Sequence, residues 1–334
     1  MKSALVTGIS GQDGSFAAEL LLKKGYAVTG VLRSLSKLGN SESFKNKVQL
    51  IEGDLRDRNF VDSLAQKQFT EIYNFASITS VASPWDDIVE VSTVAGLVPL
   101  YFLDAIRRVS STTKLFQASS AEMFGAAVDN PQTESTRYMP RSPYGVAKLF
   151  AHQMVESYRK QYGCFAVSGI LYNHESPRRS LDFVTRKITS TLARIANGSN
   201  EILEIGNVNA VRDWSYAADI VNAAWLSMQA PRPDTYIFSS GKSHSVRDFI
   251  SLAASLLKLP LHWRGEEGKE YATSGGRIIV QTHPRYYRAT EPFVRCGDSS
   301  KAEQILGWRR RVNFEGLVSL MVAADRLAIA KCEL

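Results

Sequence analysis

Four side chains that could together move a proton and a hydride lie in one part of the sequence. Ser120 and Glu122 are two residues apart, and Tyr144 and Lys148, further along, are four residues apart. Residues at that second spacing share a helix face, so we expect the Lys148 ammonium beside the Tyr144 phenol, where it stabilises the phenolate. Such a phenolate takes up a hydroxyl proton during hydride transfer. Because alcohol oxidation alone needs no further acid or base, Glu122 points to elimination of water.

Sequence signals on either side of these residues predict the elements that position them. Ser142 and Pro143 are typical of a helix start, one as the cap and the other in the first turn. Ser120 follows the apolar run 115–118, so we expect it at the carboxyl edge of a parallel sheet, where ligands bind. Glu122 lies just beyond. Facing the pocket, it can abstract the proton next to a new ketone and protonate a departing hydroxide; facing water, it has no catalytic role.

A glycine turn near the N-terminus is typical of a dinucleotide site. The glycines follow the strand-like run 4–7 and begin the helix-like run 14–24. Residues without a Cβ let the backbone approach a pyrophosphate at a helix N-terminus. Alone the pattern is weak evidence, but between a strand and a helix it predicts dinucleotide binding. The contacts expected from this turn are Gly8, Gly11, Gln12, Asp13 and Gly14.

The end of the next strand, 27–32, indicates which dinucleotide is bound. An NAD enzyme usually has an acidic residue here for the ribose 2′-hydroxyl, whereas this chain has Arg33 and no acid nearby in the sequence. An arginine pairs with a 2′-phosphate, so the sequence favours NADP over NAD, with a solvent-exposed Arg33 as the alternative. The remaining contacts are expected at the ends of the following strands: Asp54 and Leu55 at the adenine, and Phe75, Ala76 and Ser77 beneath the cofactor.

Strand-like and helix-like runs alternate from residue 3 to about 171, which is typical of a parallel sheet covered by helices on both faces. We therefore predict an α/β fold. A Rossmann-type doubly wound parallel sheet in residues 1–172 binds NADP, and residues 173–334 form mainly a smaller, mixed α/β substrate domain, with some segments returning to the first domain. Expected strands are 4–7, 27–32, 48–51, 72–76, 115–118, 166–171, 202–205 and 235–239. Expected helices are 14–24, 183–196, 217–228, one beginning at Ser245 and one through Phe314 and Met321, with a polar loop or lid at 265–288.

Composition limits the remaining function classes. With 44% hydrophobic and 22% charged residues, the 334-residue chain is typical of a globular protein, and no apolar run is expected to reach the length of a membrane span. The net charge of +7 is compatible with a nucleic-acid partner, but the basic residues are dispersed and form no nucleic-acid motif. Cys164, Cys296 and Cys332 are far apart and odd in number, which favours free thiols in a reducing, cytoplasmic compartment. We expect no metal site, no membrane and no nucleic acid.

The chain resembles the extended short-chain dehydrogenase/reductase family and, within it, the GDP-mannose 4,6-dehydratases, over almost its whole length. The matching blocks are 7–15, 117–122, 140–148, 171–179, 183–188, 212–214 and 286–291. The resemblance implies that Ser120 is the catalytic serine, Glu122 the acid and base, and Tyr144 with Lys148 the hydride-transfer pair. It also implies cofactor contacts at His174 and Arg179, and contacts to the GDP part of a substrate at Asn173, Lys187, Arg212, Arg288 and Glu291.

The implied reaction is NADP-dependent dehydration of a GDP-hexose, GDP-mannose first, to the GDP-4-keto-6-deoxy sugar, with internal hydride transfer from C4 to C6. Such an enzyme is a lyase of deoxysugar synthesis, expected as a homodimer or homotetramer. Residues 76–80, Phe124 and the shortened loop after Arg33 depart from the family pattern. The alternatives are therefore the same reaction on a GDP-manno-heptose, an NADPH-dependent 4-ketoreductase of a sugar nucleotide, and a non-catalytic NADP-binding protein.

Overall fold

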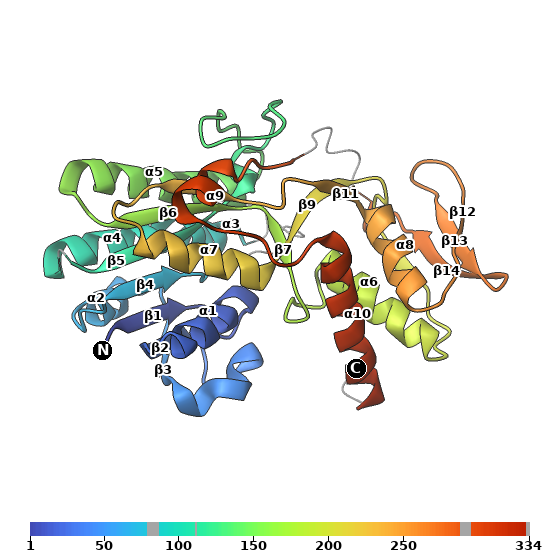
Figure 1. Cartoon of the computed structure of the whole chain (residues 1–334), viewed down its shortest axis with the longest axis horizontal. Helices are drawn as coiled ribbons and strands as arrows, with labels where there is room; N and C mark the ends of the chain where they lie inside the picture. Colours follow the sequence, from blue (N-terminus) through green and yellow to red (C-terminus); the bar gives the residue numbers. More distant parts are fainter. Residues whose placement is uncertain (79–86, 111, 288–294, 332–334) are drawn as a thin grey trace. The chain divides into compact units, whose positions relative to one another are not determined.

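The structure, a computed structural model, describes residues 1–78, 87–110, 112–287 and 295–331 (Figure 1). The chain forms two compact units, and each has a hydrophobic core of its own. The first unit comprises Met1–Tyr172, Ala217–Ser239 and Gly297–Arg309, and the second comprises Asn173–Tyr216, Ser240–Cys296 and Arg310–Leu334.

The first unit is built on a seven-stranded sheet in the order β10-β6-β5-β4-β1-β2-β3. Every neighbouring pair of these strands is parallel. The strands are β1 (Ser3–Thr7), β2 (Ala27–Leu32), β3 (Gln49–Glu52), β4 (Glu71–Asn74), β5 (Lys114–Ser120), β6 (Ala166–Leu171) and β10 (Thr235–Phe238). The strand order reverses between β1 and β4, and the carboxyl ends of strands at such a reversal are where open α/β sheets bind ligands.

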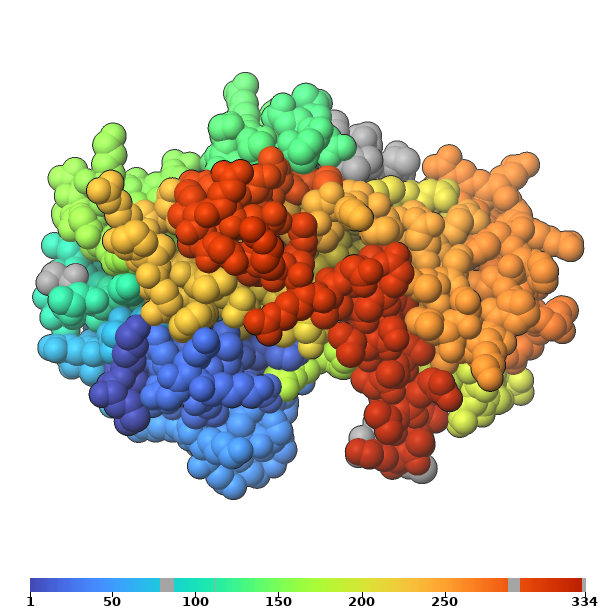
Figure 2. Space-filling model, in the orientation of Figure 1, coloured from blue at the N-terminus to red at the C-terminus, as the bar shows by residue number. Residues whose placement is uncertain are grey.

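Helices cover both faces of this sheet. On one face, α1 and α7 pack together over a core that includes Tyr73 and Phe116, and this face is turned toward the viewer in Figure 2. On the other face, α2, α4 and α5 pack over a core that includes Leu5, Phe102 and Val155. The helices are α1 (Gln12–Lys23), α2 (Arg58–Ala65), α3 (Ile88–Ser92), α4 (Val98–Val109), α5 (Pro143–Tyr162), α7 (Ala217–Gln229) and α9 (Ser300–Leu306). The predicted Rossmann-type architecture is therefore confirmed.

The stretch Ile88–Val109 corrects the expectation that no apolar run reaches the length of a membrane span. Its 22 residues join α3, a π-helical turn (Thr93–Leu97) and α4 into a run that is long and apolar enough to cross a membrane. Scattered polar residues conceal this run in the sequence. In the structure, 44% of its most apolar window is buried, and Phe102 and Ile106 belong to the core beneath the sheet. The run is thus a helix that packs on the central sheet.

In its described residues, the second unit combines two small sheets with three helices. One sheet has the order β11-β9-β7 and the other β12-β13-β14-β8. Trp214, Phe249 and Phe314 lie together at the centre of its core. The strands are β7 (Asn173–Glu175), β8 (Leu203–Ile205), β9 (Val211–Tyr216), β11 (Ser243–Ser245), β12 (His262–Arg264), β13 (Tyr271–Ser274) and β14 (Arg277–Thr282). The helices are α6 (Val184–Ala196), α8 (Val246–Leu256) and α10 (Phe314–Ala330).

Two local expectations in this unit have opposite outcomes. The helix expected at Ser245 is confirmed, because Ser245 and Asp248 form a reciprocal capping box at the start of α8. The loop or lid expected at 265–288 is wrong, since the antiparallel strands β13 and β14 occupy much of it. Gly275 and Gly276 both have positive φ and form the two-residue turn between these strands. The glycine-rich signal therefore marks a hairpin turn.

Candidate active site

The glycine turn lies between β1 and the first turn of α1. Gly8 has φ of +66°, and a Cβ there would approach the Ala76 backbone to 3.1 Å. A Cβ on Gly14 would overlap the Gly8 carbonyl oxygen. Among the described residues, no side chain caps the N-terminus of α1, which begins after Gly11. The turn therefore exposes backbone N–H groups at a helix N-terminus in a space that any larger residue would fill, which fits a pyrophosphate.

The other predicted contacts of this turn and of β4 lie close to it. Gln12 donates a hydrogen bond to Asp13. The Ala76 backbone N–H donates to the Thr7 hydroxyl at 3.1 Å, which joins the end of β4 to the end of β1. The Ser77 hydroxyl is buried and has no hydrogen-bond partner among the described residues. Phe75 and Leu55 both pack against the hydrophobic cores.

Ser120 and Glu122 are joined by their backbone at the end of β5. The Ser120 hydroxyl accepts a hydrogen bond from the Glu122 N–H at 3.2 Å and begins a short 3₁₀ turn (Ala121–Met123). Ser142 caps α5 in the predicted way, accepting from the Gly145 N–H at 3.0 Å. A Cβ on Gly145 would lie only 2.8 Å from the Glu122 carbonyl oxygen. The half-buried Glu122 therefore packs directly against the helical turn that carries Tyr144.

The pKa of Lys148 is strongly perturbed by its surroundings. Its side chain is buried, and its Nζ donates to the Ala118 carbonyl oxygen at 2.8 Å and lies 5.6 Å from the centre of the Tyr144 ring. Burial lowers the pKa of Lys148 to about 8, outweighing the opposing attraction of the Asp13 carboxylate. Below that pH the lysine places a positive charge beside the phenol in a poorly solvated site, where the charge stabilises a phenolate strongly.

A buried histidine network behind this set was missed in the sequence. His152 lies one helical turn after the lysine and is completely buried. Its Nδ1 is 2.7 Å from the Ser168 hydroxyl and 3.3 Å from that of Ser119, and its Nε2 is 2.9 Å from the Tyr138 hydroxyl and 3.3 Å from the Glu156 carboxylate. The hydrogen bond from His152 lowers the pKa of Glu156. The network joins α5 to β5 and β6. Its only signal in the sequence is that His152 lies four residues after Lys148, on the same helix face.

The predicted adenosine end of the site contains more charge than the sequence suggested. The Arg33 side chain is 79% exposed, and its guanidinium is 3.7 Å from Glu90 of α3. The Asp54 carboxylate accepts from the Arg56 Nε at 2.8 Å, and this bond is the main cause that lowers the pKa of Asp54. An acidic residue is therefore near Arg33 in space although none is near it in the sequence. Glu90 and Arg56 are additional candidate residues.

Three of the residues expected to bind the GDP part, Asn173, Lys187 and Arg212, belong to the second unit, as do His174 and Arg179. Asn173 and His174 lie on β7, which pairs with β9. The Arg179 Nε is 3.3 Å from Glu175, and its guanidinium lies over the Phe183 ring. Lys187 Nζ lies 3.6 Å from the centre of the Tyr286 ring, and Arg212 donates to the Val211 carbonyl oxygen. Arg288 and Glu291 lie outside the described residues.

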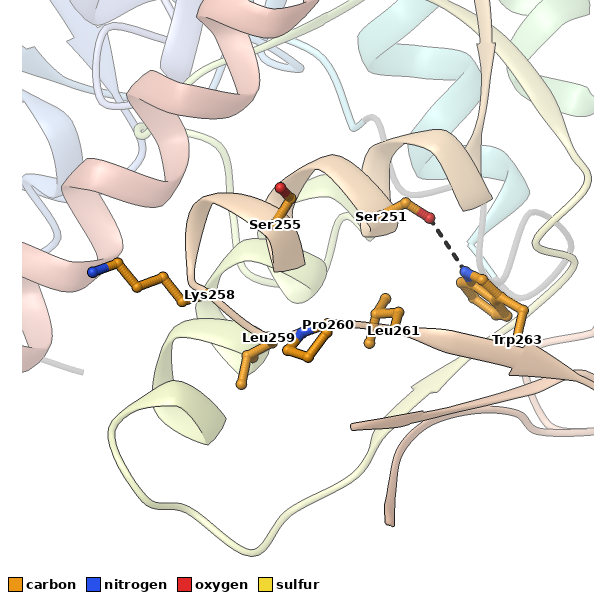
Figure 3. A pocket seen from close by; sticks show the side chains of 7 residues that line it. All are labelled: Ser251, Ser255, Lys258, Leu259, Pro260, Leu261 and Trp263. Carbon is orange, nitrogen blue, oxygen red and sulfur yellow. Dashed lines mark hydrogen bonds between the residues drawn. The ribbon is translucent and has the colours of Figure 1, made fainter. Parts of the chain in front are cut away.

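A shallow depression on the second unit lies apart from these residues in the sequence. It is lined by side chains of α8, of the segment leading into β12 and of β12 itself, where Trp263 donates to the Ser251 hydroxyl at 3.2 Å (Figure 3). It contains none of the predicted site residues. Within the described part of the chain, no group of three or more His, Cys, Asp or Glu side chains could hold a metal ion.

Fold and site together define a class of protein. A doubly wound parallel sheet with a glycine turn at its first helix, and with Ser, Tyr and Lys at its carboxyl edge, is the arrangement of the extended short-chain dehydrogenases/reductases. Solved structures share this fold. UDP-glucose 4-epimerase from Thermotoga maritima has a TM-score of 0.83 at 21% identity, covering 98% of this chain and 99% of that chain. dTDP-glucose 4,6-dehydratase from Bacillus anthracis has a TM-score of 0.81 at 16% identity, covering 97% and 96%.

Sequence comparison places the chain more narrowly. Residues 5–321 match the family described as GDP-mannose 4,6 dehydratase. The GDP-mannose 4,6 dehydratase of Dictyostelium discoideum is 40% identical over 97% of this chain and 96% of its own length. The human protein of that name is 40% identical over 96% and 91%, and the one from Vibrio cholerae is 39% identical over 97% and 94%. The chain belongs to the GDP-mannose 4,6-dehydratase family.

Proposed function

We propose that this chain is an NADP-dependent lyase that converts GDP-mannose to GDP-4-keto-6-deoxymannose by internal hydride transfer from C4 to C6. One observation carries the proposal beyond family membership. The Glu122 backbone packs against the first turn of α5, where Tyr144 lies beside the buried Lys148. A glutamate whose backbone is held against the turn that carries a tyrosine–lysine pair suits elimination, because hydride transfer alone does not use a carboxylate.

In the proposed reaction, Tyr144 takes the proton of the C4 hydroxyl while Lys148 stabilises the phenolate, and Ser120 donates a hydrogen bond to the developing ketone. That ketone acidifies C5–H, so Glu122 can remove the C5 proton and deliver a proton to the hydroxide that leaves C6. The proton held by Tyr144 then reaches C5, and the net change is loss of one water. NADP, held at the glycine turn, would accept the hydride from C4 and return it to C6.

The substrate nucleotide is assigned to the second unit. Lys187, Arg212 and Asn173, with Arg288 and Glu291, are the proposed contacts to GDP, and His174 and Arg179 are proposed to reach the cofactor. Arginine and lysine side chains suit a pyrophosphate because they offer charge-assisted hydrogen bonds. The cation–π contact of Lys187 with Tyr286 supports the assignment by placing an ammonium and an aromatic side chain together, a combination that suits a nucleotide.

The test uses GDP-mannose deuterated at C4 with a catalytic amount of NADP⁺. We expect a product lighter by one water that carries the deuterium at C6, with no net NADPH formed. A 4-ketoreductase would leave GDP-mannose unchanged and consume NADPH with a keto sugar instead. A GDP-manno-heptose that turns over faster than GDP-mannose would identify the alternative substrate. Binding of NADP without any turnover would indicate a non-catalytic protein.

We further propose a homodimer or homotetramer in the cytoplasm. Leu97, at the end of the π-helical turn before α4, and Val146 and Phe150, on α5, are large apolar side chains that are 38%, 54% and 40% exposed. An apolar face of this kind favours association with a second copy. Sedimentation of the purified chain tests the assembly: a monomer at micromolar concentration would contradict it. Cys164 is a free thiol, which is compatible with a reducing compartment.

A further inference from the structure

Two arginines from different strand ends share one carboxylate at the edge of the first unit's sheet. Arg33 follows β2 and Arg56 follows β3, and their Nη1 atoms lie 3.7 and 3.1 Å from the same oxygen of Glu90. Glu90 comes from α3 and is one-third exposed. The two guanidinium groups therefore converge on one anionic position beyond the carboxyl ends of β2 and β3.

Asp54 holds the second arginine in a fixed orientation. The Arg56 Nε bonds both oxygens of Asp54, at 3.0 and 2.8 Å, and the Arg56 backbone N–H bonds the same carboxylate at 2.9 Å. This contact uses one edge of the planar guanidinium and leaves Nη1 directed at Glu90. Hydrogen bonding to Asp54 is also the main cause that raises the pKa of Arg56. A guanidinium fixed in this way is preorganised for a second anion.

The segment that follows Arg33 is tied both to β3 and to the glycine turn. The Leu35 N–H donates to the Glu52 carboxylate at 2.6 Å. The Asn40 N–H donates to the Ser10 carbonyl oxygen, within the glycine turn, at 3.1 Å. The shared anionic position is thus at the end of the strand beside β1, next to the turn proposed to hold the pyrophosphate. That is the side of the sheet where the adenosine ribose of a dinucleotide lies.

We propose that Arg56 is a second ligand of the cofactor 2′-phosphate, oriented by Asp54, and that Glu90 is an internal competitor which the phosphate displaces from Arg33 and Arg56. The inference rests on the proposed NADP specificity. Two arginines and two carboxylates leave the cluster without net charge, so Glu90 offsets much of the attraction that two arginines would otherwise exert on a dianion. Glu90 therefore lowers the preference for NADP over NAD.

The experiment measures dissociation constants of the full chain, stripped of cofactor, for NADP⁺ and NAD⁺ by calorimetry, with 2′,5′-ADP and 5′-AMP as probes that differ by the 2′-phosphate. Arg56→Ala should weaken NADP⁺ and 2′,5′-ADP by about 10- to 100-fold, the range of a hydrogen bond to a charged group, and change NAD⁺ and 5′-AMP by less than about threefold. Glu90→Gln should tighten NADP⁺ by about 3- to 10-fold.

Two variants of matched charge serve as controls. Glu42→Gln removes a carboxylate that pairs with Lys45, and Arg58→Ala removes an arginine that pairs with Asp104. Neither should change the ratio of NADP⁺ to NAD⁺ affinity.

Three results would overturn the inference. Equal losses for both dinucleotides in Arg56→Ala would show that Arg56 does not contact the 2′-phosphate. Weaker NAD⁺ binding with unchanged NADP⁺ binding in Glu90→Gln would show that Glu90 is a ribose ligand instead. A preference for NADP⁺ that depends on Arg33 but not on Arg56 would contradict this inference without contradicting the proposed NADP specificity. By contrast, a parent enzyme that prefers NAD⁺ would contradict the proposed NADP specificity itself.

Discussion

Replacing Lys148 by methionine should stabilise the protein although it removes a proposed catalytic group. The parent lysine has a pKa lowered from 10.5 to about 8 by burial. At 1.36 kcal/mol per pKa unit, that shift corresponds to about 3 kcal/mol spent on keeping the ammonium charged inside the folded protein at neutral pH. Methionine has a similar length, fills the same buried space and carries no charge.

One hydrogen bond reduces the expected gain. Lys148 Nζ donates to the Ala118 carbonyl oxygen, and the methionine variant loses that donor. The same oxygen also accepts from the Gln117 side chain at 2.9 Å, so it remains paired. We therefore expect Lys148→Met to be more stable than the parent by about 1 to 3 kcal/mol at pH 7.

The pH dependence distinguishes this cause from a simple packing effect. Because the folded-state pKa of Lys148 lies below the unfolded-state value, the unfolded chain binds more protons between about pH 8 and pH 10.5. The stability of the parent therefore rises with pH across that window, whereas the methionine variant lacks this contribution. The gap between the two proteins should shrink by about 3 kcal/mol from pH 7 to pH 10.5.

Urea unfolding of both proteins without cofactor, at several pH values from 7 to 10.5, measures this gap. Lys160→Met is a matched control, since Lys160 lies on the same helix but is exposed. Its stability relative to the parent should not vary over the window. A gap for Lys148→Met that stays constant from pH 7 to pH 10.5 would refute the reasoning, because it would show that no buried ammonium loses its proton there.

Three further substitutions test the site. Glu122→Gln should keep NADP⁺ and substrate binding but lower the rate of dehydration by at least about 10²- to 10⁴-fold, since this acid and base acts in two steps. A near-normal turnover rate would show that Glu122 has no part in the mechanism. Arg33→Ala should weaken NADP⁺ by about 10-fold or more and leave NAD⁺ little changed in a binding titration, and equal losses would contradict its contact with the 2′-phosphate. Gly145→Ala should lower kcat by about 10-fold or more without loss of NADP⁺ affinity. The alanine Cβ would lie 2.8 Å from the Glu122 carbonyl oxygen and must displace that oxygen. An unchanged kcat would show that this contact does not set the position of Glu122.

The parts of the fold that depend on neighbours in sequence could be predicted. The glycine turn between β1 and α1, the Ser142 cap of α5 and the capping box at Ser245 are each encoded within a few residues. The hairpin at Gly275 could not be predicted from its neighbours in sequence. Glycine pairs favour both a loop and a two-residue turn, and only the pairing of the flanking strands distinguishes the two.

The charges around Arg33 show why a candidate site is harder to predict than a fold. Arg33, Arg56 and Glu90 are far apart in the sequence, and no local pattern links them. Arg33 and Arg56 follow the neighbouring strands β2 and β3 on one side of β1. Glu90 comes from α3, which follows β4 on the opposite side of β1, and its carboxylate reaches both arginines. No acidic residue follows β2 closely in the sequence, yet the Glu90 carboxylate lies near Arg33 in the folded protein.

The two ends of the proposed site are held by different kinds of contact. Around Ser120, Glu122 and Lys148 the contacts involve the backbone: a serine hydroxyl on an N–H, a helix turn against a carbonyl, and an ammonium on a strand carbonyl. Such contacts fix the reacting groups to a strand end and a helix start, which suits chemistry that tolerates little misplacement. Around Glu90 the contacts are ion pairs between partly exposed side chains, which a bound anion can exchange at small cost. A substitution among these ion pairs can therefore change the binding of the cofactor phosphate without moving the reacting groups, whereas a substitution that breaks one of the backbone contacts displaces a reacting group.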